Sequence, residues 1–75
     1  MEYVVFSKLQ VDPQSSPKWD ICYRHKKYNK CKVFCNEKKE NGSLAEYYIC
    51  ENGEYPVGYL ISHNMLPKSQ HFRYC

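Results

Sequence analysis

Residues 45–60, with the sequence AEYYICENGEYPVGYL, carry the clearest structural signal in the chain. Two runs rich in aromatic and β-branched residues flank the pair Asn52-Gly53. A tight hairpin turn needs positive φ at both central residues, and Asn-Gly adopts that conformation at low cost. The sequence therefore predicts a β-hairpin. In its register three cross-strand pairs form, which are Cys50 with Tyr55, Tyr48 with Val57, and Glu46 with Tyr59.

Both faces of this predicted hairpin are apolar or aromatic. One face carries Tyr47, Ile49, Pro56 and Leu60, and the other carries Tyr48, Tyr55, Val57 and Tyr59. Pro56 lies opposite Ile49 and has no N–H to give to the ladder, so the strand is expected at an edge or with a bulge. The second face needs a cover, which either this chain or a partner supplies.

Local patterns predict the remaining elements. A second pair, Asn41-Gly42, predicts another turn between strand-like runs. Strands are expected at residues 3–11, 19–23 and 30–36, and a Pro- and Ser-rich loop at 12–18. Residues 59–66 are expected to form either one short helical turn or a strand extension. In the third of these strands Cys31, Val33 and Cys35 share one face.

The length of 75 residues supports a single domain, residues 1–75, because a chain this short buries too little surface to form two cores. With 43% hydrophobic and 16% aromatic residues, a packed interior is expected. The strands and turns together predict a mainly β fold. We expect a small antiparallel meander or a partly closed barrel of SH3-like or OB-like size, with at most one short helical turn.

The start of the chain lacks the pattern of a secretion signal. An acid stands at position 2, and only four apolar residues follow one another. Nor does any segment reach membrane-spanning length. We therefore expect a cytoplasmic protein without membrane contact, in which the five cysteines, an odd number, are free or metal-bound rather than paired.

Four of the soft side chains are spaced closely enough to suggest a zinc site: Cys22, His25, Cys31 and Cys35. Thiolate sulfur and imidazole nitrogen are the ligands that zinc prefers. An extended strand, however, would hold Cys31 and Cys35 about 13 Å apart. The alternative is that both thiols fill the core and that no cofactor is bound. Further candidate ligands are Cys50, His63, His71 and Cys75.

A basic run with interleaved tyrosines occupies residues 23–32, YRHKKYNKCK, and its basic part is residues 24–32. Its candidate contact residues are Arg24, Lys26, Lys27, Tyr28 and Lys30. Cations neutralise phosphates and tyrosines stack on unpaired bases, so the run suits RNA or single-stranded DNA. It equally suits an acidic protein surface, or it is a solvated loop.

The chain contains eight tyrosines, a residue type that concentrates in recognition surfaces. Neither a glycine-rich phosphate loop nor a Ser-His-Asp pattern is present, so an enzyme is not expected. The leading hypothesis is a small binding or inhibitor-like protein that contacts a protein partner through Tyr48, Tyr55, Tyr59 and the basic run, as phage and mobile-element proteins do. The alternatives are a nucleic-acid-binding module and a zinc-stabilised module. Self-association is a further outcome of either kind of surface.

Overall fold

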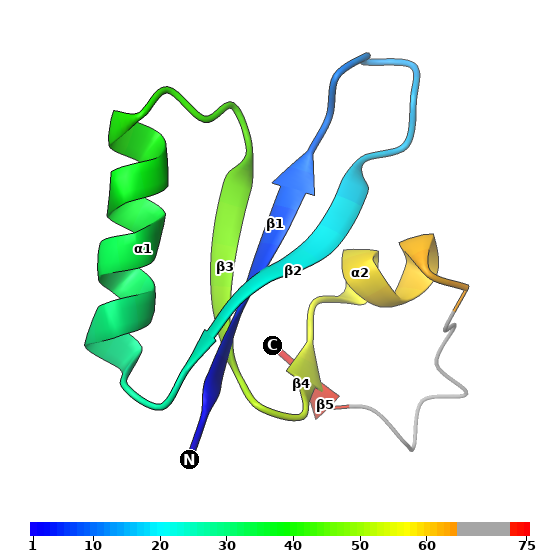
Figure 1. The fold of residues 1–75 in the computed structure, drawn as a ribbon. Coiled ribbons are helices and arrows are strands. Elements are labelled where there is room, and N and C mark those ends of the chain that lie inside the picture. The colour runs from blue at the N-terminus through cyan, green and yellow to red at the C-terminus, as the bar shows by residue number, and fades with distance from the viewer. Residues whose placement is uncertain (65–72) are drawn as a thin grey trace.

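The structure is a computed structural model, and it describes residues 1–64 and 73–75. Within these residues, seven elements follow one another (Figure 1). They are β1 (Tyr3–Leu9), β2 (Lys18–His25), α1 (Tyr28–Glu40), β3 (Glu46–Glu51), β4 (Glu54–Tyr55), α2 (Val57–Ser62) and β5 (Arg73–Tyr74).

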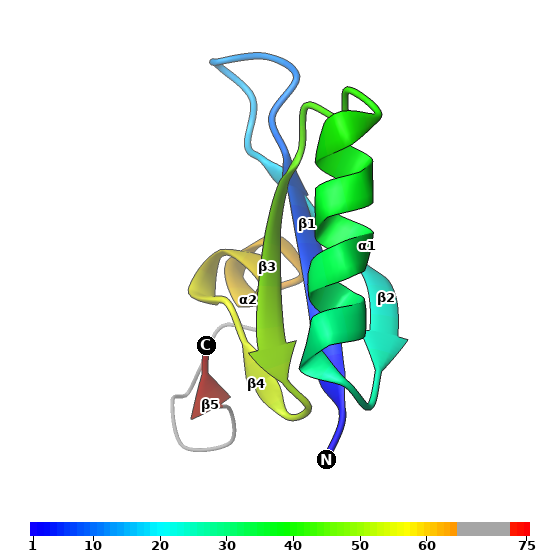
Figure 2. The same ribbon diagram turned by 90° about the vertical axis from the view of Figure 1, so that its left-hand side faces the viewer.

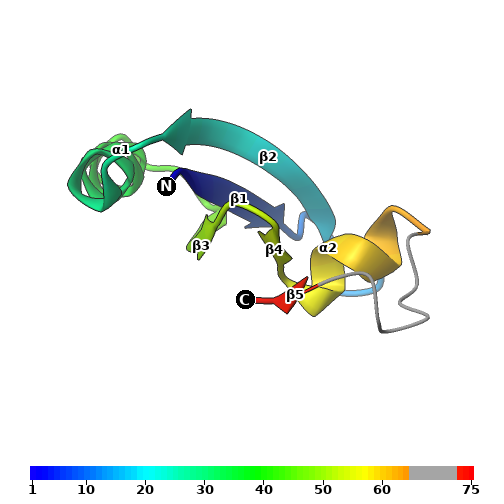
Figure 3. The same ribbon diagram turned by 90° about the horizontal axis from the view of Figure 1, so that it is seen from below.

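The centre of the fold is a three-stranded antiparallel sheet with the strand order β2-β1-β3. Helix α1 covers one face of this sheet, and α2 lies on the opposite face (Figures 2 and 3). Strands β4 and β5 form a separate parallel pair. The predicted fold class is confirmed: the protein is small and mainly β, and within the described residues its sheet stays open and does not close into a barrel.

The middle strand β1 contains a continuous apolar run, and other elements cover this strand on both faces. Val4 and Phe6 pack on the α2 side, and Val5 packs on the α1 side. All three side chains are at most 3% exposed. Because alternate residues of a strand point to opposite faces, such a run suits a strand buried on both sides.

The predicted strands at residues 3–11 and 19–23 are confirmed as β1 and β2, and a loop joins them as expected. Their register shifts between Val5 and Phe6, which pair with Tyr23 and Ile21 respectively. Cys22 is thereby left without a partner residue in β1, as at a β-bulge.

The prediction of a strand over residues 30–36 is wrong, because these residues lie inside the 13-residue helix α1. Cys31 and Cys35 are four residues apart, and in a helix that spacing puts both on one face. Both thiols are buried against the sheet beside Val5, whereas Val33 points away and is 50% exposed.

The Asn41-Gly42 pair ends a helix and does not form the predicted hairpin turn. Asn41 is the C-terminal cap of α1, and Gly42 follows with φ of +83°. The Gly42 N–H donates to the Lys39 carbonyl, and the Ser43 N–H donates to the Lys38 carbonyl, each at 3.1 Å. These two hydrogen bonds define a Schellman motif, which requires the left-handed conformation that glycine adopts easily.

Asn52-Gly53 does reverse the chain, and Gly53 has φ of +95°. The hairpin expected around it is nevertheless wrong, because β3 forms its ladder with β1 and not with the following segment. Pro56 precedes α2 as its N-terminal cap, where a missing N–H costs nothing. The expected helical turn is present as α2, whereas Met65 and Leu66 lie outside the described residues.

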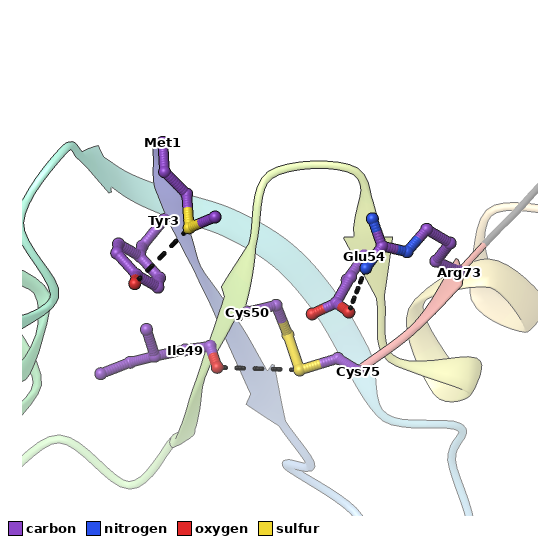
Figure 4. A network of polar contacts seen from close by, with 7 residues as sticks. All are labelled: Met1, Tyr3, Ile49, Cys50, Glu54, Arg73 and Cys75. Atoms are coloured by element: carbon purple, nitrogen blue, oxygen red, sulfur yellow. Dashed lines mark hydrogen bonds and ion pairs between the residues drawn. A yellow bond between two sulfur atoms is a disulfide. The ribbon is translucent and has the colours of Figure 1, made fainter.

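A disulfide between Cys50 and Cys75 attaches β5 to the sheet (Figure 4). The expectation of five free or metal-bound thiols is therefore wrong for these two residues, whose spacing of 25 residues gave no sign of pairing. The Cys75 N–H also donates to the Tyr55 carbonyl at 3.0 Å, and Arg73 forms an ion pair with Glu54 at 3.3 Å. Cys75 Sγ lies 3.7 Å from the Ile49 carbonyl oxygen.

Candidate functional site

A groove of about 710 Å³ lies beside α2, and we call it the α2-side groove. One wall comes from Ser16 to Asp20 at the start of β2, and the other from Gly58 and from Ile61 to His63. Lys8 of β1 also lines it. Its volume lies in the range of about 300–1,000 Å³ that is typical of ligand pockets.

Trp19 lines this groove, and several neighbouring groups contact it. Its indole ring stacks with Tyr48 at 5.5 Å between centroids, and Lys8 Nζ lies 5.7 Å from the ring centroid. His63 Nε2 lies 2.8 Å from the Trp19 carbonyl oxygen, so the end of α2 is bonded to β2. Because Trp19 is only 9% exposed, it shapes the groove without offering much of its own surface.

The three tyrosines predicted as contact anchors all lie on the α2 side, but they differ in exposure. Tyr48 is 38% exposed. Tyr55 and Tyr59 are half-buried, with their rings 5.9 Å and 5.0 Å from Phe6 in edge-to-face geometry. These two rings therefore cover the core, and Tyr48 is the most accessible of the three.

Two aliphatic residues of α2 are also exposed: Val57, which the sequence placed on the same face as Tyr48, and Ile61, which it did not suggest as a contact. Val57 and Ile61 are 47% and 53% exposed, and they are four residues apart in α2. That spacing places them on one side of the helix. Because a strand was expected over residue 57, the sequence did not indicate that Val57 and Ile61 share one side of a helix. With Tyr48 they make up what we call the α2-side apolar surface.

The basic run lies at the turn between β2 and α1, but it does not form one surface. Arg24 pairs with Val4 in the sheet, so it shares the α2 face, and it forms an ion pair with Glu2 at 3.8 Å. Lys26, Lys27 and Lys30 are exposed, at the start of α1. Tyr28 is 46% exposed.

The four candidate zinc ligands do not gather at one point: in the described residues no three His, Cys, Asp or Glu side chains are arranged to hold a metal ion. Cys31 and Cys35 lie under α1, and the Cys22 thiol donates to the Val5 carbonyl at 3.5 Å. His25 Nδ1 accepts a hydrogen bond from the Lys27 N–H at 2.9 Å. The further candidate His71 lies outside the described residues.

The three free thiols are held in their protonated form. Burial raises the pKa of Cys31, and burial together with the neighbouring Cys31 raises the pKa of Cys35. Cys22 is exposed as a residue, but partial burial of its thiol and then the neighbouring Cys35 raise its pKa as well. A thiol, unlike a thiolate, is a poor nucleophile and a poor metal ligand, so this environment does not activate any of the three.

Comparisons with models of known protein families, with curated proteins and with solved structures gave no match to this chain. Neither α1 nor α2, the helices of the described residues, is long and apolar enough to cross a membrane.

Proposed function

We propose that this protein acts by stoichiometric binding of another protein, and that the α2-side apolar surface with its adjoining groove is the contact site. The observation that carries the proposal is the exposure of Tyr48, Val57 and Ile61, together with the groove that Ile61 lines. Apolar side chains left exposed beside a concavity are a common feature of protein interfaces.

The construction of the site supports the same function. Tyr48 stacks on Trp19, and Trp19 is bonded through its carbonyl to His63, so the surface is ordered before a partner arrives. Little conformational entropy is then lost when a partner binds. None of the free thiols is activated, which favours binding over nucleophilic catalysis.

The test is site-specific photocrosslinking in the cells that produce the protein. A benzophenone side chain at position 61 should crosslink a discrete partner, whereas the same group at Val33 should not. Val33 is a matched control because it is also an exposed aliphatic residue, at 50%, but on the helix that covers the other face of the sheet.

The partner identified in this way is then purified and titrated against variants. Ile61→Asp should weaken binding at least tenfold, and Val33→Asp should leave it unchanged. Equal crosslinking from both positions would contradict the proposed site. Crosslinks only to a second copy of this chain would make the surface a homo-oligomer interface.

The redox state of Cys50 and Cys75 in the same cells indicates the compartment in which the protein resides. Cys50 and Cys75 recovered as thiols would fit the cytoplasm that we propose as the site of action, because thiols stay reduced there. Recovery of the pair as a disulfide under thiol-trapping conditions would instead indicate an oxidising compartment.

A further inference from the structure

The turn between β2 and α1 concentrates positive charge that the chain does not neutralise. Lys26, Lys27 and Lys30 are exposed, and in the described residues no carboxylate forms an ion pair with any of them. By contrast, Lys8, Arg24 and Arg73 each have an acidic partner. We call the three lysines, together with His25 and Tyr28, the basic corner.

Helix stability does not explain these lysines. The first turn of α1 contains no acidic residue, and its N-terminal cap, Lys27, makes no side-chain capping hydrogen bond. Cations at the positive end of a helix dipole are unfavourable. The corner therefore carries a charge arrangement that destabilises α1 unless an anion is bound nearby.

Two aromatic rings at the corner are held in place by the protein and remain partly accessible. Tyr28 is 46% exposed and meets the Tyr3 ring in edge-to-face geometry at 5.5 Å. His25 is half-buried and lies nearly parallel to the Tyr23 ring, at 6.1 Å and 13°. Tyr23 in turn stacks on Phe34 at 4.5 Å and 4°.

The hydrogen bond from the Lys27 N–H to His25 Nδ1 fixes the orientation of the imidazole ring. It also fixes the tautomer, because an accepting Nδ1 leaves the proton of the neutral ring on Nε2. The backbone of the lysine-bearing turn and the imidazole ring are therefore joined by a hydrogen bond, and Nε2 of the neutral ring is a donor.

From this arrangement we propose that the basic corner binds single-stranded nucleic acid, independently of the α2-side surface. Lys26, Lys27 and Lys30 neutralise backbone phosphates, and unpaired bases stack on Tyr28 and His25. Stacking requires bases that are free of a duplex, so a single strand is preferred to a double strand. An acidic protein would use the lysines but would gain little from the rings.

The test measures fluorescence anisotropy of labelled 12-nucleotide oligo-U and oligo-dT probes with the whole protein. Both are expected to bind at 50 mM salt, and a 12-base-pair duplex is expected to bind at least fivefold more weakly. Three phosphate contacts predict a slope of log affinity against log salt of about −2 for a single strand. No binding of either probe at 50 mM salt would overturn the proposal.

Charge variants test the lysines. Lys26→Ala with Lys27→Ala should make the salt slope shallower by about 1.4. The control is Lys38→Ala with Lys39→Ala, which removes the same charge from exposed positions at the other end of α1 and should leave the slope unchanged. Equal losses in the two double variants would show general charge attraction and would overturn the site.

Ring variants separate nucleic acid from an acidic protein. Tyr28→Leu should weaken oligo-U binding about tenfold, whereas Tyr28→Phe, which keeps the ring, should retain it. Tyr74→Leu, at a tyrosine of β5 that is 45% exposed, is the matched control. Wild-type affinity in Tyr28→Leu, or binding of poly-glutamate as tight as that of oligo-U, would assign the corner to an acidic protein instead.

Discussion

The backbone of Gly58 in α2 lies directly against the indole ring of Trp19. A Cβ atom at position 58 would lie 2.6 Å from Cζ2 of that ring, which is closer than carbon atoms approach without displacement. Glycine is thus required here by the close approach of helix and ring, and this contact sets the distance of α2 from the sheet.

Gly58→Ala is therefore expected to lower the free energy of unfolding by about 1–3 kcal/mol, since the helix or the indole must move. The sign of this change in unfolding free energy distinguishes the contact from a simple helix-propensity effect. Replacing glycine by alanine inside a helix otherwise stabilises a protein by about 0.5–1 kcal/mol. Urea unfolding followed by the fluorescence of the single tryptophan measures it. Val57→Ala, on the exposed side of α2, is the control and should change little. A Gly58→Ala protein as stable as wild type would contradict the contact.

Tyr59→Ala and Tyr48→Ala should separate core from surface. The Tyr59 ring contacts Phe6, Tyr55 and His63, with the last 4.2 Å away, so its loss should cost about 2–4 kcal/mol. Tyr48 is more exposed, and its loss should cost about 1 kcal/mol. Thermal melts of both variants give the comparison. Similar melting temperatures would mean that Tyr59 is not part of the core.

Gly42→Ala should destabilise the end of α1 by about 1–2 kcal/mol through the backbone alone. No atom lies within 4 Å of a Cβ at this position, so the cost comes from the φ of +83° and not from a clash. Gly42→Asn should recover part of the loss, because asparagine tolerates this conformation. Circular dichroism during urea unfolding reports the difference. Equal stability of the glycine and alanine proteins would argue against the Schellman motif.

Removing the Cys50–Cys75 disulfide should lower stability by about 3 kcal/mol, as expected for a bridge between residues 25 apart. Cys75→Ser tests this, and Cys22→Ser is the control because Cys22 is a free thiol. Titration of the denatured, unreduced protein should find three thiols. Five titratable thiols in that experiment would show that the bridge is absent.

The buried thiols predict a dependence on alkaline pH. Their pKa is raised in the folded state above the ordinary value of 9.0, so the folded protein holds these protons more tightly than the unfolded chain does. The raised thiol pKa therefore contributes its full share to the free energy of unfolding below pH 9, and this contribution is lost as the pH rises above 9. Alkylation at pH 8 should modify Cys22 faster than Cys31, which is 0% exposed. Equal rates would contradict the burial of Cys31.

The sequence was sufficient for β1, β2 and the loop between them, because apolar and β-branched runs bounded by Pro and Ser have few alternatives. It failed at residues 30–36 for a specific reason. Apolar residues at Cys31, Val33 and Cys35 fit a strand with period 2, while Cys31 and Cys35 alone fit a helix. Only tertiary packing decides between the two patterns, and here it buries the two cysteines and leaves Val33 exposed.

The candidate surface was predictable only in part. Asn-Gly supplies positive φ to a hairpin turn and to a helix end alike, so Asn41-Gly42 could not reveal which it forms. Tyr48 was predicted as a contact from the tyrosine content and from its face in the expected hairpin, but Ile61 and Val57 become neighbours only once α2 is known. Pairing of Cys50 with Cys75 is a question of distance in space, which the spacing of five cysteines does not answer.

The place of β1 between β2 and β3 has a consequence for synthesis of the protein. During translation β1 emerges with β2 close behind it, yet its other edge stays unpaired until residues 46–51 have left the ribosome. Until then the nascent chain exposes a bare strand edge that bears Val4, Val5 and Phe6, the kind of edge that pairs with other chains. Release of the chain before β3 is complete should therefore yield aggregating fragments, and folding should proceed at the slow pace of distant strand pairing.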